Sequence, residues 1–494
     1  MTNCVTAMLA SAQSNVVDPQ RFCPMLEDVR RYLGGAALAP HISTTEVMSV
    51  KCAFSGSKED VAAYLADLEK LTNVGKLDGP PFLMVVCDGQ LYKIAMVREA
   101  MRLEAGEKLH LVLLLGPEHL SWAFQSGFIQ RYMGLFLHPI LHALDFNAPS
   151  DAQRLLANKN HRFCEMILFG GQDAILRSLV TAFLESGSQH LLPSDRSRPL
   201  LPREMAYNQP ITEEMRDFHR RFLLFAAECA QDDPTNAILV ELALVEGAAL
   251  FAQHFAIRNG LLDLYLASTT QLYPYLFGTA KTMYKEIGAT SLLQMATMDP
   301  SVRELAAIAL FGTSTGNPFH LQGRDGQHEQ NISDVKGELK MRGAGASFRE
   351  VDAVTLVTAQ GRQRLIASFY NAVCTGADDR ESSWTESEKR KIVRLEAAAI
   401  TILNHFTSKN LFAQTGSKVI INKLGNGSPF PGGEALVKSY LNWMADGQRA
   451  AAVYIYARIC GVDAKLPHAL RMLITYAHAL KAPSLRANPQ HMPK

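Results

Sequence analysis

Two short apolar runs near residue 100 end abruptly at polar residues and enclose a stretch with helical spacing. The run at 82–87 stops at Asp88, and the run at 110–115 stops just before Glu118 and His119. Between the two runs, apolar side chains recur every three or four positions. A buried strand, an amphipathic helix and a second buried strand predict a βαβ unit with parallel strands. Parallel strands end at the same edge of a sheet, so these three polar residues are expected to face one crevice.

Most of the remaining chain has the apolar spacing of helices. Helices are expected at 57–68, 122–142, 164–184, 235–258, 299–312, 329–340, 385–406, 434–461 and 466–481. One further edge strand is expected at 46–54, which makes the sheet about three strands wide. The predicted fold class is α/β, with a small, mainly parallel sheet embedded in a predominantly helical protein.

Proline-rich and polar stretches divide this pattern into blocks. The predicted blocks are an irregular N-terminal segment at 1–40, an α/β core at 41–140, a helical body at 141–320, a C-terminal helical part that completes the core at 321–482, and a disordered tail at 483–494. The third and fourth blocks meet at the polar stretch 313–326, where the helical spacing is interrupted.

Charge, cysteine content and the longest apolar stretch indicate which compartment and which kinds of partner to expect. The 49 Lys and Arg against 48 Asp and Glu leave a net charge of +1, so no global charge draws the chain to nucleic acid, although a local basic groove stays open. Eight cysteines without a Cys-x-x-Cys pair indicate reduced thiols, and we expect an intracellular protein of the nucleus or cytoplasm. The apolar stretch 237–255 contains Glu241 and Glu246, which predicts a buried helix and no membrane span.

Four residues are candidates for chemistry, and each has an ordinary structural alternative. Asp88 is either a functional carboxylate or the N-cap of the helix that follows. Glu118 and His119 either face the crevice or simply occupy a first helical turn, where a carboxylate is favoured. Glu329 lies on the apolar stripe of its predicted helix, so it needs a metal, a raised pKa or an ion pair with a base such as Arg342.

Four motifs together resemble a large group of uncharacterised, eukaryotic, mobile-element-associated proteins. Residues 85–92 resemble the group's Phe-Asp-Gln-Pro-Leu-Tyr signature, and 115–119 resemble its Leu-Gly-Gly-Phe-His step. Residues 258–264 are similar to its Arg-x-Gly-x-Trp-x-Leu-His element. Residues 328–345 resemble its Ile-Glu-Gln helix, which ends in Lys-Thr-Arg-Gly-Gly. The motifs occur in the same order and with similar spacing over roughly residues 45–460.

The recurring acids of that group imply an RNase H-like core of the kind found in DDE transposases. In such a core, carboxylates bind two divalent ions, Mg²⁺ or Mn²⁺. The resemblance makes Asp88 the first carboxylate and Glu329 the third, both as metal ligands. Pro117 stands where some members have an aspartate, and proline cannot bind a metal. Glu118, one position along, would be the substitute, and His119 would orient a ligand or the phosphate.

Two functions therefore stay open. The first is a divalent-metal-dependent nuclease or transposase that acts on DNA through Asp88, Glu118, His119 and Glu329. The second is a transposon-derived protein without catalysis that binds DNA or protein, or forms a homo-oligomer, through its helical body. Pro117 and the near-neutral charge favour the second. The first requires Glu329 to pack over the strand edge, although 241 positions (329 − 88) separate it from Asp88.

Overall fold

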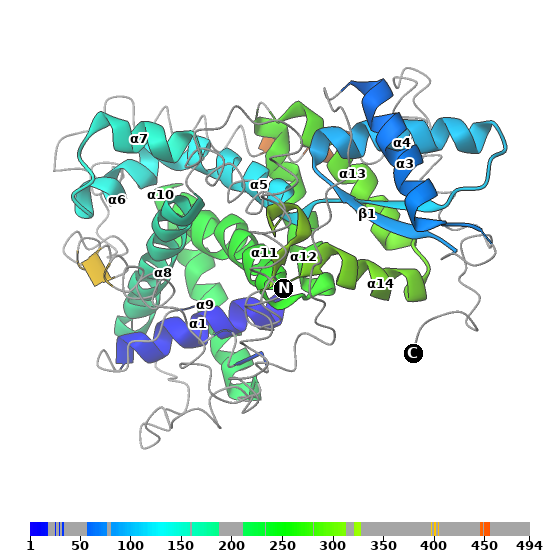
Figure 1. Cartoon of the computed structure of the whole chain (residues 1–494). Coiled ribbons are helices and arrows are strands. Elements are labelled where there is room, and N and C mark those ends of the chain that lie inside the picture. The colour runs from blue at the N-terminus through cyan, green and yellow to red at the C-terminus, as the bar shows by residue number, and fades with distance from the viewer. Residues whose placement is uncertain are drawn as a thin grey trace, which may run out of the picture.

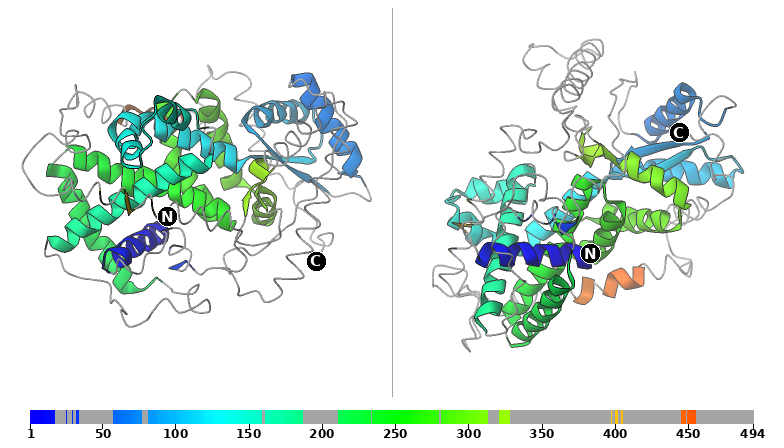
Figure 2. Two further views of the ribbon diagram at one scale, coloured as in Figure 1. Left: turned by 60° about the vertical axis from the view of Figure 1, so that its left-hand side comes forward. Right: turned by 90° about the horizontal axis from the view of Figure 1, so that it is seen from below.

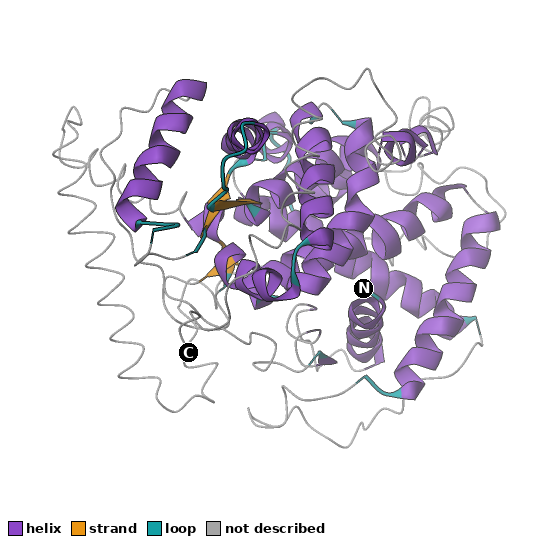
Figure 3. Ribbon diagram, turned by 90° about the vertical axis from the view of Figure 1, so that its right-hand side faces the viewer, coloured by secondary structure: helices purple, strands orange, loops and turns teal. Residues whose placement is uncertain are grey.

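The protein is a predominantly helical body with a parallel pair of short strands at one end (Figure 1). The computed structural model describes residues 1–17, 57–76, 81–158, 161–186, 211–232, 234–279, 281–312 and 321–327, with scattered helical positions in 25–33, 397–404 and 445–454. A side view shows the strands on one side of the molecule and helices making up the rest (Figure 3). The predicted class, a small parallel sheet embedded in helices, is confirmed at this level.

The strand pair and its connecting helix form a βαβ unit. β1 (Leu83–Cys87) and β2 (Leu111–Leu115) pair in parallel along their whole length, and α4 (Gly89–Glu104) connects them. Every residue of β2 is buried, whereas β1 is buried only at its last residue. The unit predicted from the two apolar runs is therefore confirmed. The strand expected at 46–54 lies outside the described residues.

The helical body has a core that runs continuously from the strands to the N-terminal helix. Its longer helices are α1 (Thr2–Val17), α3 (Lys58–Thr72), α5 (Pro117–Tyr132), α8 (His161–Glu185), α9 (Glu213–Asp232), α11 (Gly247–Asn259), α12 (Leu262–Leu272), α13 (Thr282–Thr297) and α14 (Pro300–Leu310). Shorter elements are η3 (Met133–Leu137), α6 (His138–Ala143), α7 (Pro149–Leu156), α10 (Pro234–Val240), η4 (Glu241–Glu246) and η5 (Tyr273–Gly278). Two further views show α1, in dark blue, packed along the helical body (Figure 2).

A buried glutamine joins the βαβ unit to the helical body. Gln294 of α13 donates a hydrogen bond to the carbonyl of Leu113 in β2 at 2.6 Å. Its side-chain oxygen accepts a hydrogen bond of 2.7 Å from the hydroxyl of Tyr92 in α4. Both side chains are inaccessible to solvent, so each hydrogen bond satisfies a polar group that would be costly to leave unpaired. The strand pair is therefore held against α13 by directional contacts as well as by apolar packing.

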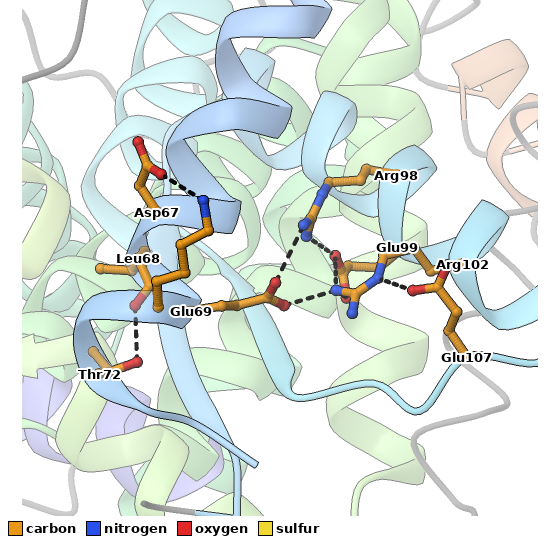
Figure 4. A network of polar contacts seen from close by, with 9 residues as sticks. Asp67, Leu68, Glu69, Thr72, Arg98, Glu99, Arg102 and Glu107 are labelled. Atoms are coloured by element: carbon orange, nitrogen blue, oxygen red, sulfur yellow. Dashed lines mark hydrogen bonds and ion pairs between the residues drawn. The ribbon is translucent and has the colours of Figure 1, made fainter. Parts of the chain in front are cut away.

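Ion pairs hold α3 against α4 on the outer side of the strand pair (Figure 4). Glu69 of α3 contacts Arg102 at 2.7 Å and Arg98 at 3.3 Å. Glu99 is fully buried between the same two arginines. Burial raises the pKa of Glu99, and the two neighbouring guanidinium groups oppose that rise. This arrangement neutralises a carboxylate that would otherwise be buried alone.

The long helix predicted to follow Pro234 is one helical run made of α10, η4 and α11. The central part is π-helical over Glu241–Glu246. A π-turn widens the helix and disturbs the regular hydrogen-bond ladder. Gln172 of α8 donates a hydrogen bond to the carbonyl of Ala243 within this turn at 3.1 Å. The run ends at Gly260, whose φ of 66° is left-handed, as the Asn-Gly pair predicts.

Two helical runs are long and apolar enough, by length and composition alone, to cross a membrane. They are Phe163–Glu185 and Asn236–Asn259, and 78% and 83% of their apolar windows are buried inside the protein. A buried core helix of a globular protein meets the same criterion, so the finding is weak evidence for a membrane. The structure gives no indication of one, in agreement with the buried helix predicted at 237–255.

Candidate functional site

Asp88 follows β1 directly and caps the next helix. Its side chain accepts a hydrogen bond of 2.9 Å from the backbone N–H of Leu91, and its own backbone is extended. This satisfies one of the N–H groups that the first turn of α4 leaves unpaired. The capping alternative considered for Asp88 is therefore what its local contacts show.

The corresponding end of β2 receives a carboxylate from a distant part of the chain. α5 begins at Pro117, directly after β2, and presents Glu118 and His119 in its first turn. Asp325 accepts hydrogen bonds from the backbone N–H of Glu118 at 3.2 Å and of His119 at 2.8 Å. A third contact of 2.9 Å joins Asp325 to Nδ1 of the His119 ring. Asp325 thus caps α5 as Asp88 caps α4, but from 206 positions along the chain.

Glycines make this close approach possible. A short antiparallel pairing between β3 (Phe311–Gly312) and β4 (Gln322–Gly323) leads the chain to the start of α5. A Cβ atom on Gly116 would lie 2.3 Å from Asp325, and one on Gly326 would lie 2.5 Å from Cγ of Glu118. Neither distance is sterically possible without movement. The segment 321–327 can therefore pack this tightly on α5 only because side chains are missing at the contact.

Glu118 is buried under this segment and carries an unusual pKa. Removal from water raises the pKa of the Glu118 carboxyl to about 7, and the negative charges of Asp325 and Glu165 add to the rise. The positive charge of Arg258 and a hydrogen bond from the backbone N–H of Gly323, at 3.2 Å, oppose it. At neutral pH the group is therefore divided between its neutral and charged forms.

A row of rings extends from the segment 321–327 along α5 to α8. His119 meets Trp122 edge to face, with ring centroids 4.7 Å apart. Trp122 stacks on His161 of α8 at 3.9 Å with nearly parallel planes. Burial lowers the pKa of the His161 imidazole, which keeps the stacked ring neutral. The row thus joins the start of α5 to the start of α8.

A second set of charged groups lies between α8 and α11. Glu165 of α8 is 3.7 Å from Nδ1 of His254 and 3.9 Å from the guanidinium of Arg258, both on α11. Glu165 and His254 are buried, and Arg258 is partly exposed. Both distances are those of charge contacts and are longer than a direct hydrogen bond. α5, α8 and α11 therefore each direct polar residues toward the same region.

The two strand ends are linked through Tyr284 of α13. A Cβ atom on Gly89, the first residue of α4, would lie 3.0 Å from the Tyr284 hydroxyl, so the ring covers the start of that helix. Burial raises the pKa of Tyr284, and the negative charges of Asp88 and Asp325 raise it further. Tyr284 therefore lies near both carboxylates, which belong to the same edge because β1 and β2 are parallel and Asp325 contacts the residues that follow β2.

The structure brings together some of the predicted site residues. Glu118 and His119 meet at the end of β2, and Asp88 lies at the end of the neighbouring strand. Glu329 lies outside the described residues, and the description stops at Gln327, two positions before it. Asp325 was not predicted, because it belongs to the polar stretch that interrupts the helical pattern. The available signal was its position three residues before the motif at 328–345.

Glu165 was also missed by the sequence analysis. It stands within the apolar run predicted as a helix at 164–184, and a carboxylate in such a run indicates a buried charged partner. The partners, His254 and Arg258, belong to another predicted helix. Helical spacing could identify the buried charge but not the side chains that meet it.

The described acidic residues do not fit a divalent-metal centre as they are arranged. Among the described part of the chain, no three His, Cys, Asp or Glu side chains are grouped so that they could hold an ion. Asp88, Glu118 and Asp325 each accept hydrogen bonds from backbone N–H groups. A metal would have to replace these donors.

Comparison of the chain with protein-family models, with curated proteins and with solved structures finds no match in any of the three. A proposal of function therefore depends on the geometry at the strand edge and on the motifs in the sequence.

Proposed function

We propose that this is a transposon-derived protein that binds DNA and that its acidic strand edge is a structural junction, not a two-metal catalytic centre. The observation that carries the proposal is the set of contacts made by Asp325. Its carboxylate accepts three hydrogen bonds, two of them from the first turn of α5 and one from the His119 ring. A carboxylate used in this way holds two parts of the chain together.

The other acids at this edge are engaged in the same manner. Asp88 caps α4, and the buried Glu118 accepts a hydrogen bond from the backbone N–H of Gly323. Hydrogen bonds to charged groups contribute roughly 1.5–3 kcal/mol each. Replacing these donors by a cation would give up the caps of two helices. Pro117 stands where some members of the group that the motifs resemble have an aspartate, which agrees with a loss of metal binding.

DNA is the proposed ligand because the four motifs resemble those of mobile-element proteins. Binding should be detected with labelled duplex and single-stranded DNA at several salt concentrations. Phosphate contacts release counterions, so the logarithm of the binding constant should fall linearly with the logarithm of salt concentration. Binding to neither form of DNA at low salt would refute this part of the proposal.

A metal-dependent nuclease is the second candidate, and one observation favours it. Asp88 and Glu118 follow adjacent parallel strands, and Asp325 contacts the start of α5, so all three belong to the carboxyl edge of the strand pair, where ligands commonly bind in open α/β sheets. An RNase H-like arrangement would require Glu329 beside these groups.

One set of experiments separates the two candidates. The wild type, Asp88→Asn and a control, Asp67→Asn at an exposed position of α3, are melted with and without Mn²⁺ and incubated with labelled DNA. Asparagine caps a helix about as well as aspartate, so a junction predicts equal melting temperatures, no metal response and intact DNA. DNA cleavage that needs Mn²⁺ and disappears only in Asp88→Asn would establish the nuclease instead.

A further inference from the structure

α9 presents two chemically different faces. Its buried face consists of large apolar side chains that pack around Phe183 of α8, with ring centroids 5.3–5.7 Å from Phe218, Phe222 and Phe225. This face accounts for the position of α9 beside α1 and α8, at the side of the molecule away from the strands (Figure 1). The opposite face is exposed, and it is not simply polar.

Two leucines interrupt the exposed face. The exposed fraction is 63% for Leu224 and 42% for Leu223. Of the large apolar side chains that are exposed in the described part of the chain, these are the only two on one helix. Ala227, one turn beyond Leu223, is exposed as well and extends the apolar surface. Leu224 lies between Ala227, three positions on, and Leu223 beside it, so the three side chains form one small exposed apolar patch on α9. Such a patch with a charged surround is typical of a surface that pairs with another helix.

Charges lie symmetrically about Leu224. Arg220 stands four residues before it and Glu228 four residues after it, and both are exposed on the same face of α9. When two copies of α9 meet antiparallel with Leu224 at the crossing point, Arg220 of one copy lies opposite Glu228 of the other. The two-fold axis repeats this pair, so the surface is complementary to itself. A parallel arrangement would instead place like charges opposite each other.

We propose that the exposed face of α9 is a self-association surface through which two copies of this chain pair antiparallel about Leu224. The charge pattern selects the second copy as the occupant, because one helix face supplies both members of each ion pair. In the single chain Arg220 contacts Asp217 at 3.1 Å, and such an exposed pair contributes little, so the guanidinium is able to turn toward a partner.

The pairing should be weak and sensitive to salt. One helix face is smaller than the roughly 1,200–2,000 Å² that stable protein interfaces bury, so dimers are expected at hundreds of micromolar protein and not at nanomolar concentrations. Exposed ion pairs are screened by salt, and the dissociation constant should therefore rise with ionic strength. This homodimer does not depend on whether the strand edge is a junction or a catalytic centre.

Charge reversal provides the test, with sedimentation velocity over a range of protein concentrations as the measurement. Arg220→Glu and Glu228→Arg should each raise the dissociation constant at least about tenfold, because each places like charges opposite each other twice. The double variant Arg220→Glu/Glu228→Arg restores both pairs and should dimerise as the wild type does. A mixture of the two single variants should form heterodimers for the same reason.

Controls make the result specific. Lys70→Glu, an exposed reversal on α3, should leave the dissociation constant unchanged, and circular dichroism should show that every variant is folded. A wild type that stays monomeric at the highest concentration overturns the proposal. Two further results also overturn it: single reversals without effect, and a double variant that fails to recover association.

Discussion

The buried carboxyl of Glu118 should make the stability of the protein depend on pH, and Glu118→Gln should remove that dependence. The pKa of this group is about 7 in the folded protein and has an ordinary value of 4.5. The folded state therefore holds the proton more tightly than the unfolded chain does. Ionisation of Glu118 penalises folding progressively as the pH rises from about 4.5 to about 7, and the penalty is complete above that range.

The size of the effect follows from the two pKa values. Each pKa unit corresponds to ~1.4 kcal/mol, so the full penalty is about 3 kcal/mol at alkaline pH. Between pH 5 and pH 8 the free energy of unfolding should fall by about 2–3 kcal/mol from this group alone. Glutamine has nearly the same shape and keeps an oxygen that can accept the hydrogen bond of Gly323, but it has no charge to lose.

Urea unfolding at pH 5 and pH 8 measures the difference. For each protein, the free energy of unfolding at pH 8 is subtracted from that at pH 5. All other titrating groups are common to wild type and Glu118→Gln, so the difference between the two results is the contribution of Glu118. Glu59→Gln, at an exposed position in the first turn of α3, is the matched control and should behave as the wild type does. Equal pH dependence in wild type and Glu118→Gln would refute the claim that this carboxyl is buried and perturbed.

Two further predictions concern packing. Leu244→Ala, in the buried π-helical turn η4, should lower the free energy of unfolding by ~2–5 kcal/mol, and a loss under ~0.5 kcal/mol in denaturant melts would place the helix at the surface. Gly116→Ala should destabilise the protein by more than ~1 kcal/mol, because the new methyl group would lie 2.3 Å from the Asp325 carboxylate. Gly106→Ala is a contrasting variant: no atom lies near its added Cβ, so any loss there comes from its left-handed φ of 77°, whereas Gly116 has a φ of −60° and its loss comes from the clash.

Local signals in the sequence account for much of the described fold. The apolar runs at 82–87 and 110–115 predict both strands, and Asp88 after the first run and Gly116-Pro117 after the second predict where the strands end. Asp299 before Pro300 predicts the start of α14, where the aspartate side chain accepts a hydrogen bond from Ser301. These features depend on residues within a few positions of each other, so pattern and capping chemistry are sufficient to find them.

The candidate site was only partly predictable, because its parts meet through the tertiary fold. Asp88, Glu118 and His119 follow predicted strands, so their shared edge could be inferred. The contribution of Asp325 to this edge could not be inferred, because no residue near it in the sequence indicates that it caps a helix more than 200 residues earlier. The predicted position of Glu329 over the edge stays a prediction. The helix that contains Glu329 is predicted from its apolar stripe. Such a stripe shows that one face of the helix is buried, but it does not identify the surface against which that face packs.

The cap that Asp325 places on α5 also constrains the order in which the protein can fold. The βαβ unit is built from residues close in sequence, so its strands can pair early. The cap closes a loop of 206 residues, and long-range contacts of this kind form late because the ends of the loop must first be brought together. During synthesis, α5 is made long before Asp325. Until Asp325 is present, the first N–H groups of α5 and the Glu118 side chain are exposed to water. This contact can therefore form only after the chain has been synthesised as far as Asp325.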